Sequence, residues 1–179
     1  MLKISAFSRR QFAASALSTA ALATLPAPSR ADATMHSING DATITLTPYL
    51  LFDGNCQQAM EFYRSCVGGE LTLMKVKDSP VKDQMPTVQL NKTLHARLKS
   101  RNLEISASDW LQLDTTPIRG NTVCLCLSGG TLQELKAVFE KLSEEAEDIT
   151  PLREIFFGVY GALNDKFGVR WMFTATKDN

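Results

Sequence analysis

The residues best suited to chemistry lie in two alternating segments near the middle of the chain. His95 alternates with Arg97 and Lys99, which places it on the polar face of a predicted strand. Glu104 and Ser106 alternate on the next segment, so a hairpin would set them across from His95. An imidazole beside a carboxylate can act as a general base or contact an anion. The alternative is a half-exposed strand histidine without a catalytic role.

The four cysteines form neither a metal signature nor a local disulfide. Cys56 and Cys66 are ten residues apart on one predicted helix, about 15 Å at 1.5 Å per residue. Cys124 and Cys126 are two residues apart on one predicted strand, with parallel side chains and no neighbouring base to activate a thiol. The paired Cys-x-x-Cys spacing of zinc sites is missing. We expect four free thiols, while a bridge from the helix to the strand stays open.

The amino terminus has the three parts of an export signal, which we expect to span residues 1–33 and to be removed. A twin-arginine motif contains Arg9 and Arg10, a weakly apolar run follows, and small residues surround Ala31 and Ala33. The run has roughly 13 residues, whereas a membrane span needs ~20. We expect the twin-arginine machinery to carry a folded chain to the periplasm or the outside, with no stable membrane anchor.

The remaining residues, 34–179, are expected to form a single domain with a slightly negative charge. The whole sequence has 19 basic and 19 acidic residues, and the signal contains four of the basic residues and one of the acids. The balance that is left, about −3, argues against a nucleic acid or an anionic membrane as partner. A domain of this length buries about two thirds of its unfolded surface.

The predicted elements occur twice in the same order, which is a strand, a helix and then further strands. The first helix has Asn55 as a candidate N-cap and a stop at Gly68 and Gly69, and the second opens with a capping box of Thr131 and Glu134. Each unit leaves one face of its sheet uncovered, so two units must pair, which creates a cleft between the uncovered faces. The predicted helices span residues 56–67 and 132–142. The predicted strands span residues 43–52, 71–76, 94–99, 103–108 and 122–127, and two or three short strands follow the second helix, the last at residues 169–174.

Two blocks of sequence carry a resemblance to a known family. They are TPYLLFDGNCQQAMEFY at residues 47–63 and GALNDKFGVRWMF at residues 161–173. Together they resemble the PhnB-like branch of the vicinal oxygen chelate superfamily, which includes glyoxalase I, bleomycin-resistance proteins and extradiol dioxygenases. The resemblance implies an α+β fold of two paired βαβββ modules, about residues 43–110 and 121–175. These modules would form a cupped mixed sheet with the helices on the outside.

The resemblance also implies where a metal would bind. Enzymes of the superfamily hold a divalent metal with four side chains, at positions that fall near Pro48, Glu104 to Ser106, Thr122 and Met172. Of these, only Glu104 is a candidate ligand, and a weak one. Since a catalytic metal needs about three protein ligands, we expect no metal and no other cofactor. A divalent metal at a displaced site of His95, Glu104 and another group is the alternative.

The strand parity of the family directs Arg170, Met172 and Thr174 into the cleft and Trp171 into the core. Arg170 would contact a carboxylate or phosphate there, although a salt bridge to Glu104 or Asp165 is an equal alternative. The cleft would then contain more positive groups than negative ones, because the only carboxylate is that of Glu104. It would prefer small anions, which would meet His95, Arg97 and Arg170. The ligand-binding candidates are Arg97, Ser106, Thr122, Arg170 and Met172.

Two turns also contain polar or aromatic residues. Asp109 and Trp110 close the first module, either as a strand-ending turn or at the mouth of the cleft. Asn164 and Asp165 are expected to set the hairpin turn before the last strand.

Three functional interpretations follow. The first is an exported glyoxalase-like, PhnB-like domain that binds a small anionic molecule without metal chemistry. The second is a metal-dependent lyase, isomerase or dioxygenase. The third is a structural or partner-binding module. We expect a homodimer or an internally paired monomer, and favour the homodimer, because an open sheet face is costly to leave solvated.

Overall fold

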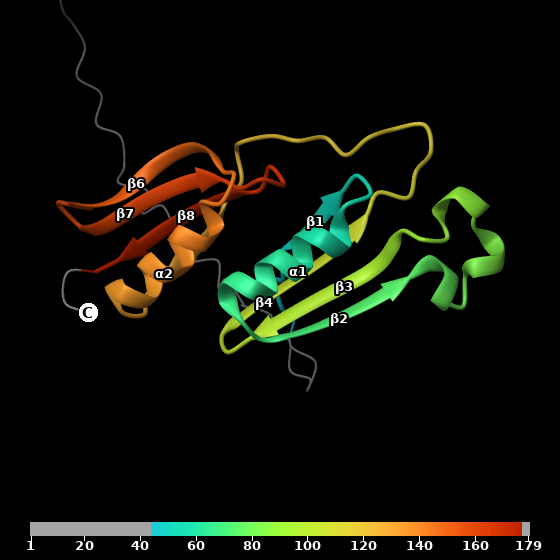
Figure 1. The fold of residues 1–179 in the computed structure, drawn as a ribbon, viewed down its shortest axis with the longest axis horizontal. Coiled ribbons are helices and arrows are strands. Elements are labelled where there is room, and N and C mark those ends of the chain that lie inside the picture. Colours follow the sequence, from blue (N-terminus) through green and yellow to red (C-terminus); the bar gives the residue numbers. More distant parts are fainter. Residues whose placement is uncertain (1–43, 177–179) are drawn as a thin grey trace, which may run out of the picture. The chain divides into compact units, whose positions relative to one another are not determined.

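The computed structural model describes residues 44–176, and the predicted export signal lies outside these residues. The chain forms two βαβββ modules, each with a four-stranded mixed sheet and one long helix (Figure 1). The predicted α+β fold of two such modules is confirmed. None of the helices in the described part is both long and apolar enough to cross a membrane.

The first module has the strand order β1-β4-β3-β2, with β1 parallel to β4 and the other pairs antiparallel. Three short 3-10 turns lie between β2 and β3. The elements are β1 (Tyr49–Phe52), α1 (Cys56–Val67), β2 (Glu70–Lys75), η1 (Val76–Asp78), η2 (Lys82–Gln84), η3 (Thr87–Gln89), β3 (Thr93–Ser100) and β4 (Leu103–Asp109).

The second module repeats this topology. Its strand order is β5-β8-β7-β6, and β5 and β8 form the parallel pair. The elements are β5 (Leu125–Ser128), α2 (Leu132–Leu142), β6 (Glu147–Ile155), β7 (Gly158–Asn164) and β8 (Arg170–Ala175).

Both helices begin and end where the sequence predicts, but α1 is capped differently. Asn55 makes no capping hydrogen bond, since its backbone lies outside the extended region that aims an N-cap side chain at the first turn. The Asp109 carboxylate accepts from the Cys56 amide instead, at 2.9 Å. Gly68 and Gly69 both have positive φ and end the helix as expected. In α2, the predicted capping box of Thr131 and Glu134 is present.

Two strands begin later than predicted. Residues 44–48 have no regular pairing, although residues 47 and 48 would lie opposite Glu104 and Ile105 of β4. The Pro48 carbonyl accepts from the Ser106 amide at 3.0 Å, but proline has no amide hydrogen with which to continue the ladder. In the β5 register, Thr122 would lie opposite Gly168 in the turn before β8. Thr122 is therefore exposed in a bend and does not lie on a strand.

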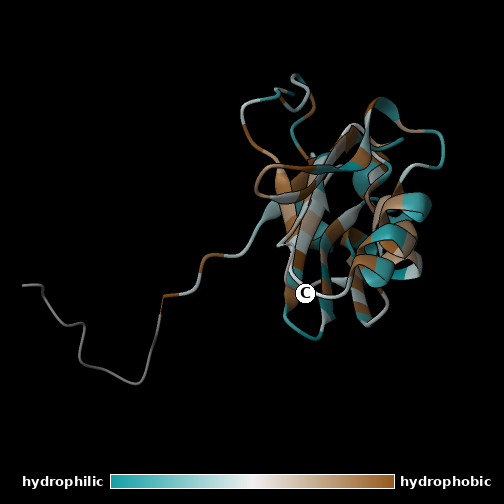
Figure 2. Cartoon of the chain, turned by 90° about the vertical axis from the view of Figure 1, so that its left-hand side faces the viewer, coloured by the Kyte–Doolittle hydropathy of each residue, from teal (hydrophilic) through white to brown (hydrophobic). Residues whose placement is uncertain are grey.

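Each helix buries one side against its sheet, and the two modules share a core. Figure 2 shows both helices in alternating hydrophilic and hydrophobic colours, as expected for helices with one buried face. Phe139 of α2 packs edge-on against Phe173 of β8, with ring centroids 5.0 Å apart. Tyr63 of α1 packs against Trp171 of β8, at 5.4 Å, and so joins the modules. The core also contains Phe52, Met60, Leu98, Ile105, Leu142 and Leu163.

Candidate functional site

The uncovered face of the first sheet gathers the candidate residues of that module. Strand register places Arg97 opposite Ser106, and Lys99 opposite Glu104, on the face away from α1. His95 lies on the same face of β3 as Arg97. The predicted strand parity of this hairpin therefore agrees with the observed register.

Arg97 and Glu104 neutralise each other. The guanidinium donates from Nε to Oε1 at 2.9 Å and from Nη2 to Oε2 at 2.8 Å, a bidentate pair on the sheet surface. The hydrogen bond from Arg97 lowers the pKa of Glu104, and the pKa of Arg97 is raised in turn. The positive charge of Arg97 is therefore already matched by a carboxylate.

His95 is paired with Tyr49 and not with Glu104. The Tyr49 hydroxyl lies 3.3 Å from His95 Nδ1, and the ring centroids are 5.9 Å apart. Glu104 is unavailable because Arg97 holds both of its oxygens. The interpretation of His95 as a base oriented by Glu104 is therefore wrong in its partner.

The uncovered face of the second sheet contains Arg170, Met172 and Thr174, all half-buried. The Nη1 atom of Arg170 donates to Asn164 Oδ1 at 3.1 Å. Within residues 44–176, no carboxylate lies within ion-pair distance of this guanidinium, so neither of the salt bridges considered from the sequence forms. Arg170 is a half-buried cation positioned by a neutral amide.

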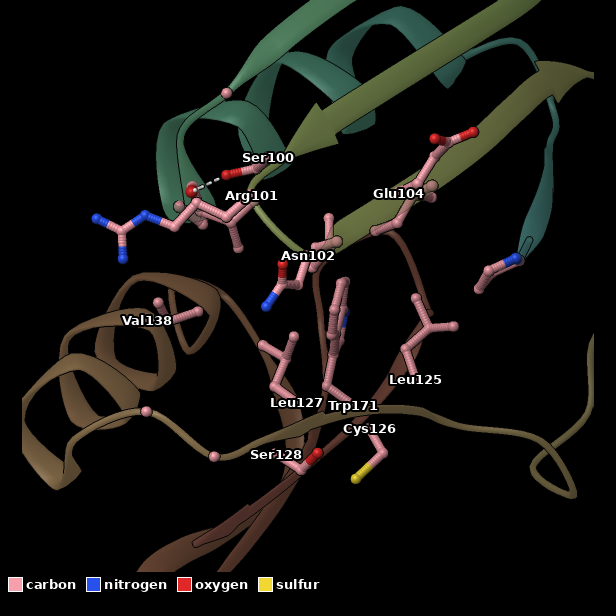
Figure 3. A pocket seen from close by; sticks show the side chains of 18 of the residues that line it. Ser100, Arg101, Asn102, Glu104, Leu125, Cys126, Leu127, Ser128, Val138 and Trp171 are labelled. Atoms are coloured by element: carbon pink, nitrogen blue, oxygen red, sulfur yellow. Dashed lines mark hydrogen bonds between the residues drawn. The ribbon is translucent and has the colours of Figure 1, made fainter. Parts of the chain in front are cut away.

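A crevice of about 1310 Å³ lies between the modules (Figure 3). Its walls include Asn102 and Glu104 from the first module and Leu127, Val138 and Trp171 from the second. Glu104 is the one sequence-predicted site residue in this lining. The predicted cleft that joins His95 and Arg97 to Arg170 is not formed there, because none of these three side chains lies in the walls of the crevice.

A buried carboxylate, that of Asp165, connects the two modules, whereas the sequence placed it in a turn or in an ion pair with Arg170. Asp165 Oδ1 accepts from the amides of Phe167 and Val169, both at 2.9 Å, which is the expected turn role. Asp165 Oδ2 accepts from the Tyr63 hydroxyl at 2.7 Å and from Trp171 Nε1 at 2.8 Å. Burial and the adjacent Asp165 raise the pKa of Tyr63. Trp171 is a core residue, as predicted.

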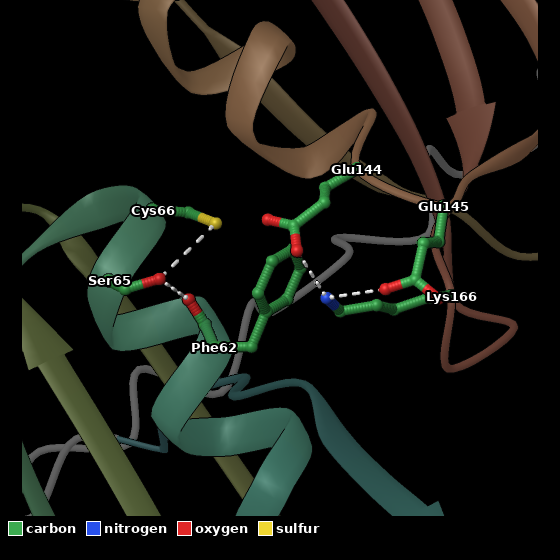
Figure 4. A network of polar contacts seen from close by, with 6 residues as sticks. All are labelled: Phe62, Ser65, Cys66, Glu144, Glu145 and Lys166. Carbon is green, nitrogen blue, oxygen red and sulfur yellow. Dashed lines mark hydrogen bonds and ion pairs between the residues drawn. The ribbon is translucent and has the colours of Figure 1, made fainter.

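Two further contacts tie the modules together at the surface. Lys166 Nζ lies 3.0 Å from Glu144 and 3.3 Å from Glu145, and 4.3 Å from the centre of the Phe62 ring (Figure 4). Lys141 Nζ donates to the Ser65 carbonyl at 3.0 Å. Lys166 therefore lies against an aromatic ring of the first module while it pairs with carboxylates of the second.

Asp109 and Trp110 have structural roles. The Asp109 carboxylate is buried and accepts from the amides of Cys56 and Thr93, at 2.9 and 2.7 Å. Trp110 Nε1 donates to the Thr115 hydroxyl at 3.0 Å. These contacts favour the strand-ending turn over a place at a binding site.

All four cysteines are free. Cys56 and Cys66 are buried, and burial raises the pKa of the Cys56 thiol to about 12 and also raises that of Cys66. Cys124 and Cys126 are exposed.

The donor set does not fit the divalent metal that the superfamily's enzymes use. The positions expected to hold it carry Pro48, Ser106, Thr122 and Met172, and Glu104 is engaged by Arg97. In the described part of the chain, no three His, Cys, Asp or Glu side chains converge as a metal site would require.

Two βαβββ modules with a shared core and open sheet faces define the vicinal oxygen chelate fold. A domain from Frankia sp. EAN1pec, described as a glyoxylase/bleomycin resistance protein/dioxygenase domain, shares this fold at 14% identity and a TM-score of 0.54, over 77% of this chain and 96% of that one. Residues 44–174 match the family described as 3-demethylubiquinone-9 3-methyltransferase, and the chain belongs to that family.

Three relatives match across nearly their whole length. Protein YjdN of Escherichia coli K12 is 29% identical over 146 residues, which are 74% of this chain and 95% of YjdN. The crystal structure of PA1353 from Pseudomonas aeruginosa has 30% identity and a TM-score of 0.64, over 75% of this chain and 98% of that one. The PhnB protein from Bacillus cereus has 24% identity and a TM-score of 0.58, over 74% and 100%.

Proposed function

We propose that this PhnB-like domain binds a small anionic molecule on the uncovered face of its second sheet, at Arg170. The observation that supports this proposal is the half-buried guanidinium, which Asn164 holds in place without neutralising it. Met172 and Thr174 lie beside it on the same face of β8. A carboxylate or phosphate would gain a charge-assisted hydrogen bond from Arg170 and apolar contact from Met172.

The proposed site contains fewer residues than the cleft predicted from the sequence. Arg97 is excluded because Glu104 already pairs with it, and His95 is excluded because it lies on the other sheet and contacts Tyr49. Thr122 is excluded because it does not lie on a strand. The proposal concerns ligand binding alone, and it does not include the methyl transfer named in the family's description.

Thermal melting with a panel of small carboxylates and phosphates tests the proposal. A charge-assisted contact contributes roughly 1.5 to 3 kcal/mol when shielded from water, or about tenfold or more in affinity. We expect at least one anion to raise the melting temperature and Arg170→Ala to abolish the rise. Arg64→Ala is the matched control, since it removes the same charge from an exposed position on α1. A rise that survives Arg170→Ala would overturn the proposal.

We also propose that the protein acts without the superfamily's divalent metal. The mismatch between the expected ligand positions and the residues present supports this proposal. Purified protein should contain less than one equivalent of zinc, nickel, manganese and iron, and a chelator should leave the melting temperature unchanged. One tightly held equivalent of these metals would favour the enzyme alternative.

We propose, finally, that the domain works outside the cytoplasm. The twin-arginine motif at Arg9 and Arg10 supports this proposal. Replacing both residues with lysine should leave the precursor in the cytoplasm, as cell fractionation would show. Normal export of that variant would contradict the twin-arginine route.

A further inference from the structure

The edge of the second sheet brings three sulfur atoms to one surface. Cys126 of β5 lies directly opposite Met172 of β8 in the parallel register. Neighbouring strands lie roughly 4.7 to 4.9 Å apart, so the side chains at these paired positions are neighbours on one face. Cys126 Sγ lies 3.9 Å from the Thr174 hydroxyl on the same face. The sulfur of Cys126 therefore points along β8 on the uncovered side of the sheet.

Cys124 adds a second thiol to this group of sulfur atoms. It lies two residues before Cys126, and in an extended chain side chains two residues apart point to the same face. In the β5 register, position 124 lies opposite Arg170, next to Met172 along β8. Figure 3 shows Cys126 directed away from Trp171, which lies on the helix-covered side of the sheet. Cys124 itself precedes β5, and continuation of the β5 register would put its thiol on the same face as Cys126 and Met172.

The two thiols differ from the other cysteines in their accessibility. Cys124 and Cys126 are exposed, whereas Cys56 is fully buried and Cys66 nearly so. Of the four thiols, those of Cys124 and Cys126 are therefore the ones accessible to an ion in solution.

The chemistry of the donors selects the kind of ion. Thiolate and thioether sulfurs are soft ligands, which favour Cu⁺ and Ag⁺ over magnesium, calcium or manganese. The positions around Cys126 on this face carry Ser128, Thr174 and Ala162, so no carboxylate at these positions supplies the hard oxygen ligands that divalent ions prefer.

We propose that Cys124, Cys126 and Met172 bind one soft monovalent metal ion, Cu⁺ or Ag⁺. Two thiolates and one thioether give a three-coordinate sulfur site at the sheet edge. Binding releases the two thiol protons to solvent, and neither the metal nor the sulfur changes oxidation state. The site adjoins the proposed anion contact at Arg170, and the two have Met172 in common, as a sulfur ligand here and as an apolar contact there.

Competition for Cu⁺ under nitrogen tests the proposal. The folded protein, reduced beforehand, is titrated into the coloured Cu⁺ complex of bicinchoninic acid, and the loss of colour gives the copper transferred. We expect one equivalent for the wild-type protein and none for the double variant Cys124→Ser, Cys126→Ser. Met172→Leu keeps the volume but removes the thioether, so it should weaken retention by an order of magnitude or more. Both cysteines are exposed, so the serine variants should fold, which circular dichroism checks.

Two controls distinguish this site from copper binding elsewhere on the chain. Cys66→Ser should retain the full equivalent, since Cys66 lies on the buried face of α1. Arg170→Ala should still bind one equivalent of copper but should lose the rise in melting temperature that the anion causes. Met172→Leu should weaken copper binding more than anion binding. No transfer to the wild-type protein, or an equivalent that disappears with Cys66→Ser, would overturn the proposal. Failure of the anion test alone would leave the copper result intact.

Discussion

At the scale of single residues, Asp165 shows how a buried charge can be held without a cation. Its two oxygens accept four hydrogen bonds, two from backbone amides and two from the side chains of Tyr63 and Trp171. Hydrogen bonds to an ionised group are stronger than those between neutral groups. Because Tyr63 belongs to the first module and Asp165 to the second, the hydrogen bonds of this carboxylate also join the modules.

Removal of one donor should therefore destabilise the whole fold. Tyr63→Phe deletes the hydroxyl and leaves the ring contacts, and we expect the free energy of unfolding to fall by about 1.5 to 3 kcal/mol. Urea denaturation measures the change. Tyr160→Phe is the matched control, since Tyr160 is half-buried on the uncovered face of β7 and should change stability little. Equal effects of the two substitutions would contradict the role assigned to Asp165.

The buried thiol of Cys56 predicts an alkaline dependence of stability. Burial, with the adjacent Asp109, raises its pKa from 9.0 to about 12. Below pH 9 the thiol is protonated in both states, and its contribution is fully present. Between pH 9 and about 12 the unfolded chain loses a proton that the folded chain keeps, so the free energy of unfolding falls as pH rises.

The slope of stability against pH is the readout. We expect a loss of up to about 1.4 kcal/mol per pH unit from this group, and Cys56→Ala should show a shallower slope than the wild-type protein. The comparison of slopes removes the cost of the cavity, which is the same at every pH. Lysines contribute equally to both proteins. Parallel slopes would mean that the thiol ionises as freely in the folded state as in the unfolded state.

At the scale of elements, the helices were predictable and the edge strands were not. The residues that define α1 and α2 are local, namely an apolar face of period 3.6, two glycines after α1 and the capping box before α2. The extent of β5 depends on where β8 begins, which the local sequence of β5 does not contain. The cap of α1 was missed for the same reason, because Asp109 reaches it from the end of β4.

The capping box itself gives a test at this scale. Thr131 Oγ1 accepts from the Glu134 amide at 3.2 Å, and Glu134 Oε2 accepts from the Thr131 amide at 2.9 Å. Thr131→Ala should lower the free energy of unfolding by about 1 kcal/mol. Glu140→Ala on the same helix is the control, because the ion pair that it would remove is an exposed one at 3.9 Å. A control that costs as much as Thr131→Ala would show that the cap contributes nothing specific.

The candidate site shows what the alternation of side chains along a strand can predict and what it cannot. Alternation correctly placed Arg97 with Ser106 on the uncovered face of the first sheet, and the resemblance to the family correctly placed Arg170 with Met172 on that of the second. The pattern within one strand could not show that Glu104 pairs with Arg97 or that Tyr49 contacts His95, because each contact joins side chains of two different strands. Sequence patterns thus predicted the face of each side chain, whereas its partner required the sheet register.

At the scale of the whole molecule, each sheet ends in an edge strand with apolar neighbours in solvent. β1 and β5 each pair with only one strand in the described part of the chain. Leu46, before β1, is 97% exposed, and Val123, before β5, is 77% exposed. Unpaired edges with adjacent apolar side chains favour association with another chain. A second copy offers the same two edges, so a symmetric dimer can cover both.

We therefore expect the protein to be a homodimer through these edges. Light scattering should give twice the mass of one chain, and Leu46→Lys or Val123→Lys should reduce the measured mass to that of one chain. A lysine on an edge disfavours strand association without loss of the chain's own pairing, since neither residue lies in a strand. Val88→Lys is the matched control, because Val88 is 72% exposed in a 3-10 turn far from both edges in the sequence. A single-chain mass at high concentration, or dimers that survive both edge substitutions, would show that these edges remain unpaired in solution.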